Sequence, residues 1–219
     1  MVLAALSRWH RLNGSARSWI IDVEYATVLN TASRGLLVAA AIAALLLPAH
    51  SQSLQERQAA CVGCHGENGQ SRIPEVPSLG AQPEYYVTIQ LVMFRDKLRE
   101  VEVMNEAMSG ASDDVVRALA SFVSKLPPPK PVVDIPDVAR FERAKALVRA
   151  FRCDFCHRSD LAGERNVPRL AGQREDYLVK ALRGYKDNSR PGYDASMADV
   201  VEPITDQQIL DLAYYLARL

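Results

Sequence analysis

Two copies of one short pattern contain all four cysteines of this 219-residue chain: Cys61-Val-Gly-Cys64-His65 and Cys153-Asp-Phe-Cys156-His157. In C-x-x-C-H the two thiols lie about one helical turn apart and point the same way. They can therefore form thioether bonds to the two vinyl groups of one haem, while the histidine that follows binds the iron. The spacing predicts two covalently bound haem c groups, one at each motif.

Zinc binding and thiol redox chemistry are the alternatives for these motifs. A structural zinc site groups four cysteines, or two cysteines with two histidines, so the two motifs would have to meet in space. A thioredoxin-like C-x-x-C requires a βαβ setting, and the sequence shows no convincing strand alternation. Haem is favoured because each half of the chain is small, and a haem would fill the centre of its marginal core.

The second axial ligand of each iron is expected to be a methionine. Of the four histidines in the chain, the two outside the motifs fall within a predicted export signal. The second half contains one methionine, Met197, and the internal repeat aligns it with Met104. Met108 aligns with a valine and is the alternative ligand, while Met93 falls on an expected helix, where a core role is favoured. The expected axial ligands are His65, Met104, His157 and Met197.

The second half of the chain repeats the first. A proline is followed nine residues later by a tyrosine in both copies, at Pro77 and at Pro168. Three consecutive prolines, Pro127 to Pro129, separate the copies and favour an extended, stiff connection. We expect four segments: an export signal at 1–51, a first domain at 52–126, a linker at 127–136 and a second domain at 137–219.

Both copies have the apolar periodicity of helices. Helices are expected before each motif, over 53–60 and 137–152, and at the end of each copy, where Ser112 and Thr205 are the expected N-caps. Four apolar stripes at helical spacing are expected: Val87, Leu91, Phe94 and Leu98; Leu178, Leu182 and Tyr185; Phe141, Ala144, Val148 and Phe151; and Ile209, Leu212, Ala213 and Leu216. Little sheet is expected.

Matched prolines and arginines are candidates for the haem environment. Pro77 and Pro168 follow the motif histidines by 12 and 11 residues. Each proline loop is expected to pack against the proximal haem face, where a carbonyl accepts the N–H of the ligand histidine. Arg99 and Arg190 also match between the copies. They are expected to neutralise haem propionates, and a solvated surface charge is the alternative for each.

Residues 1–51 resemble an export signal. The 13 uncharged residues from Gly35 to Leu47 follow Arg34, and small residues suited to cleavage come after them. The apolar stretch is shorter than the ~20 residues that a spanning helix needs. Cleavage is therefore favoured, a retained anchor with membrane association is the main alternative, and a buried core helix is the other.

Charge and composition limit the function further. Lys+Arg and Asp+Glu each number 26, and the absence of a basic excess argues against nucleic acid as a partner. A hydrophobic fraction of 48% excludes global disorder. The halves differ in charge: 52–126 carries seven basic and ten acidic residues, whereas 137–219 carries 14 and 13. We expect the two ends to dock different partners electrostatically.

The chain resembles the dihaem cytochrome c4 family, in which two class I cytochrome c domains follow one another. The resemblance is carried by CVGCHGENGQS, PSLGAQPEYY, FRDKLR and MNEAMSGASDD in the first copy and by CDFCH, PRLAGQREDYL and YKDNSRPGYDASM in the second. It covers 55–219 and implies an all-α fold of two small class I cytochrome c-like helical domains joined by a Pro-rich linker. The family further implies periplasmic electron transfer, His/Met ligation and haems close across a domain interface. One departure is Arg158, since the family has glycine after the motif histidine; the stretch from there to Val167 is also shortened.

The expected function is electron transfer by a dihaem c-type cytochrome in the periplasm. Its expected partners are redox proteins: a quinol-oxidising complex or a dehydrogenase as donor, and a terminal oxidase or another reductase as acceptor. Closed His/Met coordination leaves no position for a substrate, so a carrier rather than an enzyme is expected. The alternatives are the cytochrome subunit of a periplasmic dehydrogenase, such as a flavocytochrome, and a dihaem enzyme with one open haem.

Overall fold

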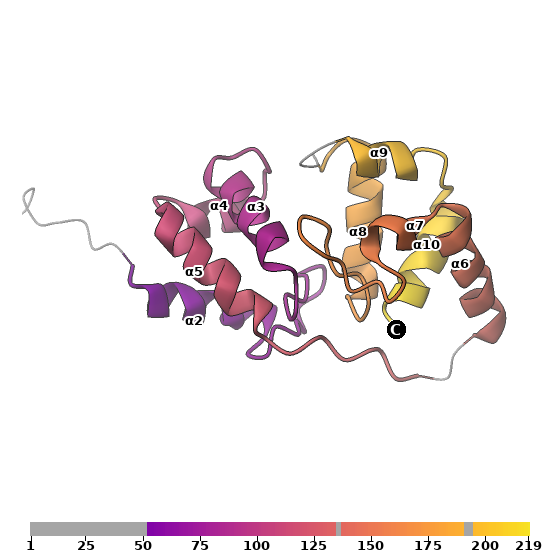
Figure 1. The fold of residues 1–219 in the computed structure, drawn as a ribbon, viewed down its shortest axis with the longest axis horizontal. Helices are drawn as coiled ribbons and strands as arrows, with labels where there is room; N and C mark the ends of the chain where they lie inside the picture. The colour runs from indigo at the N-terminus through magenta and orange to yellow at the C-terminus, as the bar shows by residue number, and fades with distance from the viewer. Residues whose placement is uncertain (1–51, 135–136, 191–194) are drawn as a thin grey trace, which may run out of the picture. The chain divides into compact units, whose positions relative to one another are not determined.

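The structure is a computed structural model that describes residues 52–134, 137–190 and 195–219. The predicted export signal at 1–51 and the last two residues of the predicted linker lie outside the described residues. The helices in chain order are α2 (Leu54–His65), α3 (Glu84–Arg95), α4 (Glu102–Met108), α5 (Asp113–Ser124), α6 (Val138–Ala150), α7 (Cys153–His157), α8 (Glu175–Lys186), α9 (Ser196–Val201) and α10 (Asp206–Leu216) (Figure 1).

The all-α prediction is confirmed for the described residues. Besides helices, their regular structure includes an isolated antiparallel bridge between Glu164 and Val167. No helix in the described ranges combines the length and apolarity needed to cross a bilayer.

Helix α2 carries the first motif on its last turn. It begins with a capping box, in which the Ser53 hydroxyl accepts from the Glu56 N–H and the Glu56 carboxylate accepts from the Ser53 N–H. The helix runs through both cysteines and ends at His65, beyond the predicted end at residue 60. Gly66 then takes φ 86° and turns the chain away. The two thiols therefore share one helical face, as haem attachment requires.

The second motif lies on a separate short helix. The predicted helix over 137–152 ends earlier, because Arg152 bonds back three residues to Arg149 and adopts a left-handed φ of 52°. The chain then restarts as α7, which holds both cysteines and ends at His157. The two copies thus present the same motif on different local backbones.

Each half has its own apolar core. In the first half α3 packs against α5 and α4 (Figure 1), and the core consists of Val87, Leu91, Phe94, Met108, Ala111, Val116, Leu119, Ala120 and Val123. The prediction for Leu98 is wrong, because α3 ends at Arg95 and the chain turns at Lys97, leaving Leu98 61% exposed. The Ser112 cap is present, since its hydroxyl accepts from the Val115 N–H.

In the second half α10 packs against α6 and α8. The core there consists of Ala144, Val148, Leu161, Ala171, Leu178, Val201, Ile204, Ile209, Leu212, Ala213, Tyr215 and Leu216. The predicted stripes on α6 and α10 are confirmed, with Phe141 and Phe151 packing against this core. The capping box of Thr205 with Gln208 is also present.

The described part of the predicted linker is non-helical and contacts both halves. Its backbone passes so close to two glycines that a Cβ on Gly80 would lie 2.0 Å from the Pro127 carbonyl oxygen, and one on Gly172 would lie 2.6 Å from that of Pro129. The Val132 N–H donates to the carbonyl of Ala217 at 2.9 Å. Residues Gln52–Leu219 form one compact unit, and the boundaries of the two domains stay a prediction.

Candidate haem-binding sites

Both motif histidines are buried and held by the predicted proline loops. His65 Nδ1 lies 2.8 Å from the carbonyl oxygen of Pro77, and His157 Nδ1 lies 2.8 Å from that of Pro168. Because a carbonyl can only accept, Nδ1 carries the proton in both rings. The lone pair of Nε2 is therefore left available for a metal in each half.

Burial lowers the pKa of both histidines. The loss of hydration outweighs the hydrogen bond to the proline carbonyl, which acts in the opposite direction. His65 and His157 are thereby held as neutral imidazoles, the form that binds iron.

The four cysteines have the properties of attachment points and not of a redox pair. All four are free thiols; Cys64 and Cys156 are exposed, whereas Cys61 and Cys153 are half-buried. Burial raises the pKa of Cys61, and it raises that of Cys153 to about 11. The Cys61 and Cys153 thiols are therefore protonated at neutral pH, unlike the low-pKa thiolate of a disulfide oxidoreductase.

The zinc alternative finds no support in the arrangement of the motifs. Both motifs lie within the described residues, and no three His, Cys, Asp or Glu side chains there come together to hold a metal ion. A closed zinc site would require four such ligands around one point.

In each half one half-buried methionine and one motif cysteine pack against the same core. Met104 on α4 and Cys61 pack against the first-half core, and Met197 and Cys153 pack against the second-half core. Met108 is 2% exposed within the core itself, and Met93 is also buried, as expected for a structural role. Met197 lies on the short helix α9.

The matched arginines both lie near Tyr177 and Tyr86. Arg190 donates from Nη1 to the Tyr177 hydroxyl at 2.7 Å and from Nη2 to the Tyr86 hydroxyl of the first half at 3.4 Å. Arg99 instead donates to Gln90 Oε1 at 2.6 Å. A purely solvated role is therefore wrong for Arg190, which is half-buried and has partners in both halves.

Tyr86 and Tyr177 served only as markers of the repeat in the sequence, yet both hydroxyls lie at this cluster. Burial alone would raise the pKa of Tyr177, but the positive charges of Arg190 and Arg99 outweigh it and lower this pKa to about 8. The pKa of Tyr86 is raised, because burial dominates there. The cluster is thus an electropositive site suited to anionic groups.

Sequence comparison places these sites among known proteins. Residues 141–219 match the cytochrome c family. A thiosulfate dehydrogenase electron acceptor of Thiomonas intermedia is 31% identical over 198 residues, which cover 84% of this chain and 90% of that protein. A cytochrome c4 of Pseudomonas aeruginosa is 26% identical over 176 residues, which cover 75% and 86% of the two chains.

Structural comparison gives the same result. The cytochrome c4 structure of Acidithiobacillus ferrooxidans matches with a TM-score of 0.66 and 28% identity, covering 74% of this chain and 99% of the other. Reduced cytochrome c4 of Pseudomonas stutzeri matches with a TM-score of 0.67 and 25% identity, covering 77% and 100%. The chain belongs to the dihaem cytochrome c4 family. Its two cytochrome c-like halves each carry one haem c site with histidine and methionine ligands, and it is an electron carrier of the c4 type.

The donor set fits haem c in both halves. Two thiols on one helical face, a neutral histidine with Nε2 available and a half-buried methionine beside the same core are the groups that a His/Met haem c requires.

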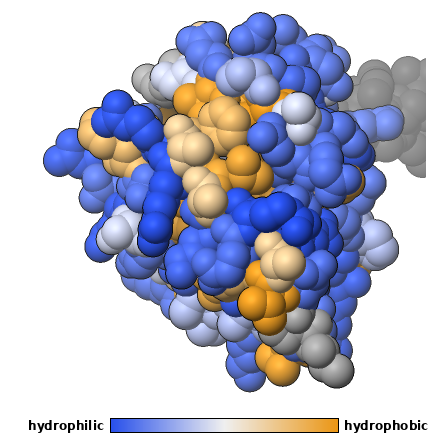
Figure 2. Space-filling view, turned by 90° about the vertical axis from the view of Figure 1, so that its right-hand side faces the viewer, coloured by the Kyte–Doolittle hydropathy of each residue, from blue (hydrophilic) through white to orange (hydrophobic). Residues whose placement is uncertain are grey.

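Apolar surface is visible among hydrophilic surface in Figure 2. Phe155, between the two cysteines of the second motif, is 76% exposed.

The departure from the c4 pattern at Arg158 has a backbone consequence. Arg158 has φ 72° and ψ 162°, close to the φ 86° and ψ 143° of Gly66 at the matching place in the first copy. This region of backbone space is populated almost only by glycine. The second copy therefore keeps the turn of the first with a strained residue.

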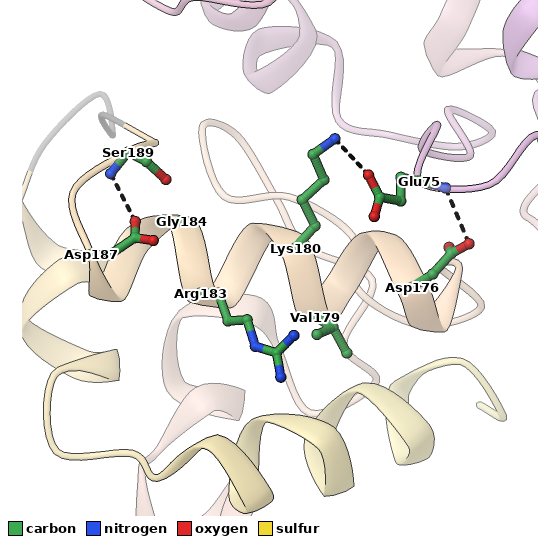
Figure 3. A pocket seen from close by; sticks show the side chains of 8 residues that line it. All are labelled: Glu75, Asp176, Val179, Lys180, Arg183, Gly184, Asp187 and Ser189. Atoms are coloured by element: carbon green, nitrogen blue, oxygen red, sulfur yellow. Dashed lines mark hydrogen bonds and ion pairs between the residues drawn. The ribbon is translucent and has the colours of Figure 1, made fainter.

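Helix α8 of the second half holds a loop of the first half. Lys180 forms an ion pair with Glu75 at 2.9 Å, and Asp176 accepts from the Glu75 N–H at 3.1 Å; Figure 3 shows both directed to this residue. Arg174 adds a bond from Nη1 to the Ser71 carbonyl at 3.2 Å. The held loop leads to Pro77, so the second half supports the loop that holds His65.

Proposed function

We propose that the chain is a periplasmic electron carrier that takes electrons from a quinol-oxidising complex or a dehydrogenase and passes them to a terminal oxidase or another reductase. One observation supports this best: each half has one buried motif histidine held as a neutral imidazole, and one half-buried methionine that packs against the core of that half. Haem iron, when bound, supplies one-electron transfer. The protein sets its potential and the surface that meets each partner.

We assign the axial ligands to His65 and Met104 in the first half and to His157 and Met197 in the second. The thioether bonds are assigned to Cys61 and Cys64, and to Cys153 and Cys156. The haem domains are 52–126 and 137–219. With both axial positions filled by protein, neither site leaves room for a substrate, which supports a carrier without enzymatic activity of its own.

We assign Arg190, and with it Arg99, to the haem propionates. The support is the positive charge that Arg190 and Arg99 bring to the tyrosine cluster, together with the contacts of Arg190 with tyrosines of both halves. A positive charge beside a propionate favours the reduced iron, so Arg190→Leu should lower one of the two midpoint potentials. Arg149→Leu, at an exposed position of α6, is the control and should leave both potentials unchanged.

A second donor is favoured by one observation. The relative from Thiomonas intermedia, 31% identical to this chain, is a thiosulfate dehydrogenase electron acceptor. A thiosulfate-oxidising dehydrogenase is therefore the alternative source of electrons to a quinol-oxidising complex. In that case the chain would act as the acceptor of a periplasmic enzyme.

The test is rapid mixing of the oxidised protein with each reduced donor in turn. The favoured donor should reduce it at a rate that depends strongly on ionic strength, because the first half has an acidic excess and the second half has not. Rates that do not respond to salt would contradict electrostatic docking. Fast reduction by thiosulfate dehydrogenase alone would select the second donor.

A further inference from the structure

Two buried glutamines join each half to the histidine loop of the other. Ser78 donates its N–H to Gln173 Oε1 at 2.8 Å, and Gln173 Nε2 donates to the Ser78 carbonyl at 2.8 Å. Gln82 of the first half makes the equivalent pair with Arg169 of the second half. The Arg169 N–H donates to Gln82 Oε1 at 3.0 Å, and Gln82 Nε2 donates to the Arg169 carbonyl at 2.9 Å. Both glutamines are almost fully buried, at 4% and 6% exposure. The arrangement is reciprocal, as the internal repeat of the chain requires.

The peptide group that each glutamine contacts is the one that holds the other half's histidine. The Ser78 N–H and the Pro77 carbonyl belong to the same peptide group, and that carbonyl accepts from His65 Nδ1. A continuous chain of hydrogen bonds therefore runs from Gln173 through one peptide to His65. The equivalent chain runs from Gln82 through the Pro168–Arg169 peptide to His157.

Hydrogen bonds in such a chain strengthen one another. An acceptor on the N–H side of a peptide polarises it, so that its carbonyl oxygen becomes a better acceptor, by about 10–30% per bond in a buried setting. A stronger bond from Nδ1 gives the ligand histidine more imidazolate character and makes it more basic. A more basic ligand stabilises ferric over ferrous iron and lowers the potential.

We propose that Gln173 and Gln82 are positioning residues that act crosswise, each lowering the reduction potential of the haem in the opposite half. This inference rests on the assignment of His65 and His157 as axial ligands. It gives the tandem arrangement a specific consequence: neither half sets its potential alone. Asp176 and Lys180 of α8 strengthen the link by holding Glu75, two residues before Pro77 (Figure 3).

Gln70 provides a control within the same chain, at an exposed position. It makes the same kind of reciprocal pair with a backbone peptide, donating to the Lys130 carbonyl at 3.1 Å and accepting from its N–H at 3.3 Å. Its partner lies in the predicted linker and not in a proline loop that holds a histidine.

The experiment uses the full chain carrying both haems, with the substitutions Gln173→Leu, Gln82→Leu and Gln70→Leu. The two midpoint potentials are followed separately by NMR, with haem resonances assigned through the protons of Cys61 and Cys153. Gln173→Leu should raise the potential of the first-half haem only, and Gln82→Leu that of the second-half haem only. Gln70→Leu should move neither. The Nδ1–H proton of His65 should exchange faster with solvent in Gln173→Leu, and that of His157 should not.

Gln173→Glu keeps the size of the side chain and its acceptor oxygen, and it serves where the leucine variant folds poorly. It should leave the first-half potential at or below the wild-type value. Shifts in the half that carries the substitution, equal shifts in both haems or no shift would each overturn the proposal. Failure of the ligand assignment is a separate result, because it appears in the unsubstituted protein as the absence of the weak red absorption of ferric methionine ligation.

Discussion

Met104 and Met108 lie four residues apart on α4, yet only Met108 is enclosed by the first-half core, while Met104 lies half-buried at its edge with Cys61. Burial and partial exposure divide the two methionines into a packing residue and an available ligand. The alignment of the two repeats also selects Met104 as the ligand, because Met104 aligns with Met197.

The different burial of Met104 and Met108 predicts that substitutions at the two positions differ in their effect on iron ligation. Met104→Ala should open one iron, so that the reduced protein binds about one carbon monoxide per chain and one ferric methionine band is lost. Met108→Leu conserves volume and should cost less than ~1.5 kcal/mol of unfolding free energy with both irons closed. Carbon monoxide titration checks both variants. Uptake by Met108→Leu together with none by Met104→Ala would reverse the assignment.

The strained backbone at Arg158 predicts that a substitution at this position stabilises the folded protein. Its φ of 72° and ψ of 162° are strained for a residue with a Cβ, whereas glycine adopts them freely. Arg158→Gly should raise the free energy of unfolding by about 1 kcal/mol, after allowance for the greater entropy of the unfolded glycine chain. Urea unfolding of the haem-loaded protein measures the change.

Arg149→Gly is the control for this prediction. Arg149 is exposed within α6, where glycine should lower the free energy of unfolding by about 0.5–1 kcal/mol. Destabilisation by both variants would mean that the turn after His157 carries no strain.

The hydrogen bonds of Asp176 predict that the contact between the halves is sensitive to acid. Burial alone would raise its pKa, but hydrogen bonds from Arg174 at 2.6 Å and from the Glu75 N–H outweigh burial and hold the pKa below the usual range. A depressed pKa gives stability that is present above the unfolded pKa of ~3.9 and is lost as the pH falls through the folded value.

The unfolding free energy should therefore fall as the pH drops below about 3.9, and more steeply in the wild type than in Asp176→Asn. Urea titrations at several pH values give both profiles. Parallel profiles for the two proteins would show that Asp176 does not contribute to this sensitivity.

Among these variants, the substitution of Asp211 is expected to cause the largest loss of stability. It is 4% exposed on α10 and accepts from Arg140 Nε of α6 at 2.9 Å. Asp211→Ala would leave a half-buried guanidinium without this partner, which should cost about 2–3 kcal/mol. Glu142→Ala removes an exposed ion pair with Lys145 and should change stability by less than ~1 kcal/mol. Equal losses in the two variants would contradict the buried role of Asp211.

The local features of the site could be predicted from the sequence, because they depend on short spacing. Two cysteines three residues apart and a histidine next to them fix the haem attachment wherever that segment is helical. The proline loops were also predictable, since Pro77 and Pro168 repeat at almost the same distance from the histidines, and their hydrogen bonds are present.

Contacts between the halves could not be predicted in this way. Gln82 and Gln173 are conspicuous only as repeated residues, and their partners lie 87 and 95 positions away. Nothing in helical periodicity connects residues at that separation. The tyrosine and arginine cluster was missed for the same reason, since Arg190 reaches Tyr86 across 104 positions.

The errors in the predicted helices come from local backbone turns. Leu98 continued an apolar stripe in sequence, but α3 had already ended, with a left-handed turn at Lys97. The helix before the second motif stopped for a similar reason at Arg152. Neither residue is a glycine or a proline, so the usual signals of a helix end were absent.

The central claim is that both irons are covalently attached and closed by protein ligands. Protein matured with a haem c system should give two covalent haems per chain in the pyridine haemochrome assay, and the reduced form should not change its spectrum under carbon monoxide. A carbon monoxide shift in one haem would reveal an open or labile iron, favour an enzymatic role and make Met104 the first assignment to reject. Fewer than two covalent haems would contradict the account of the repeat itself.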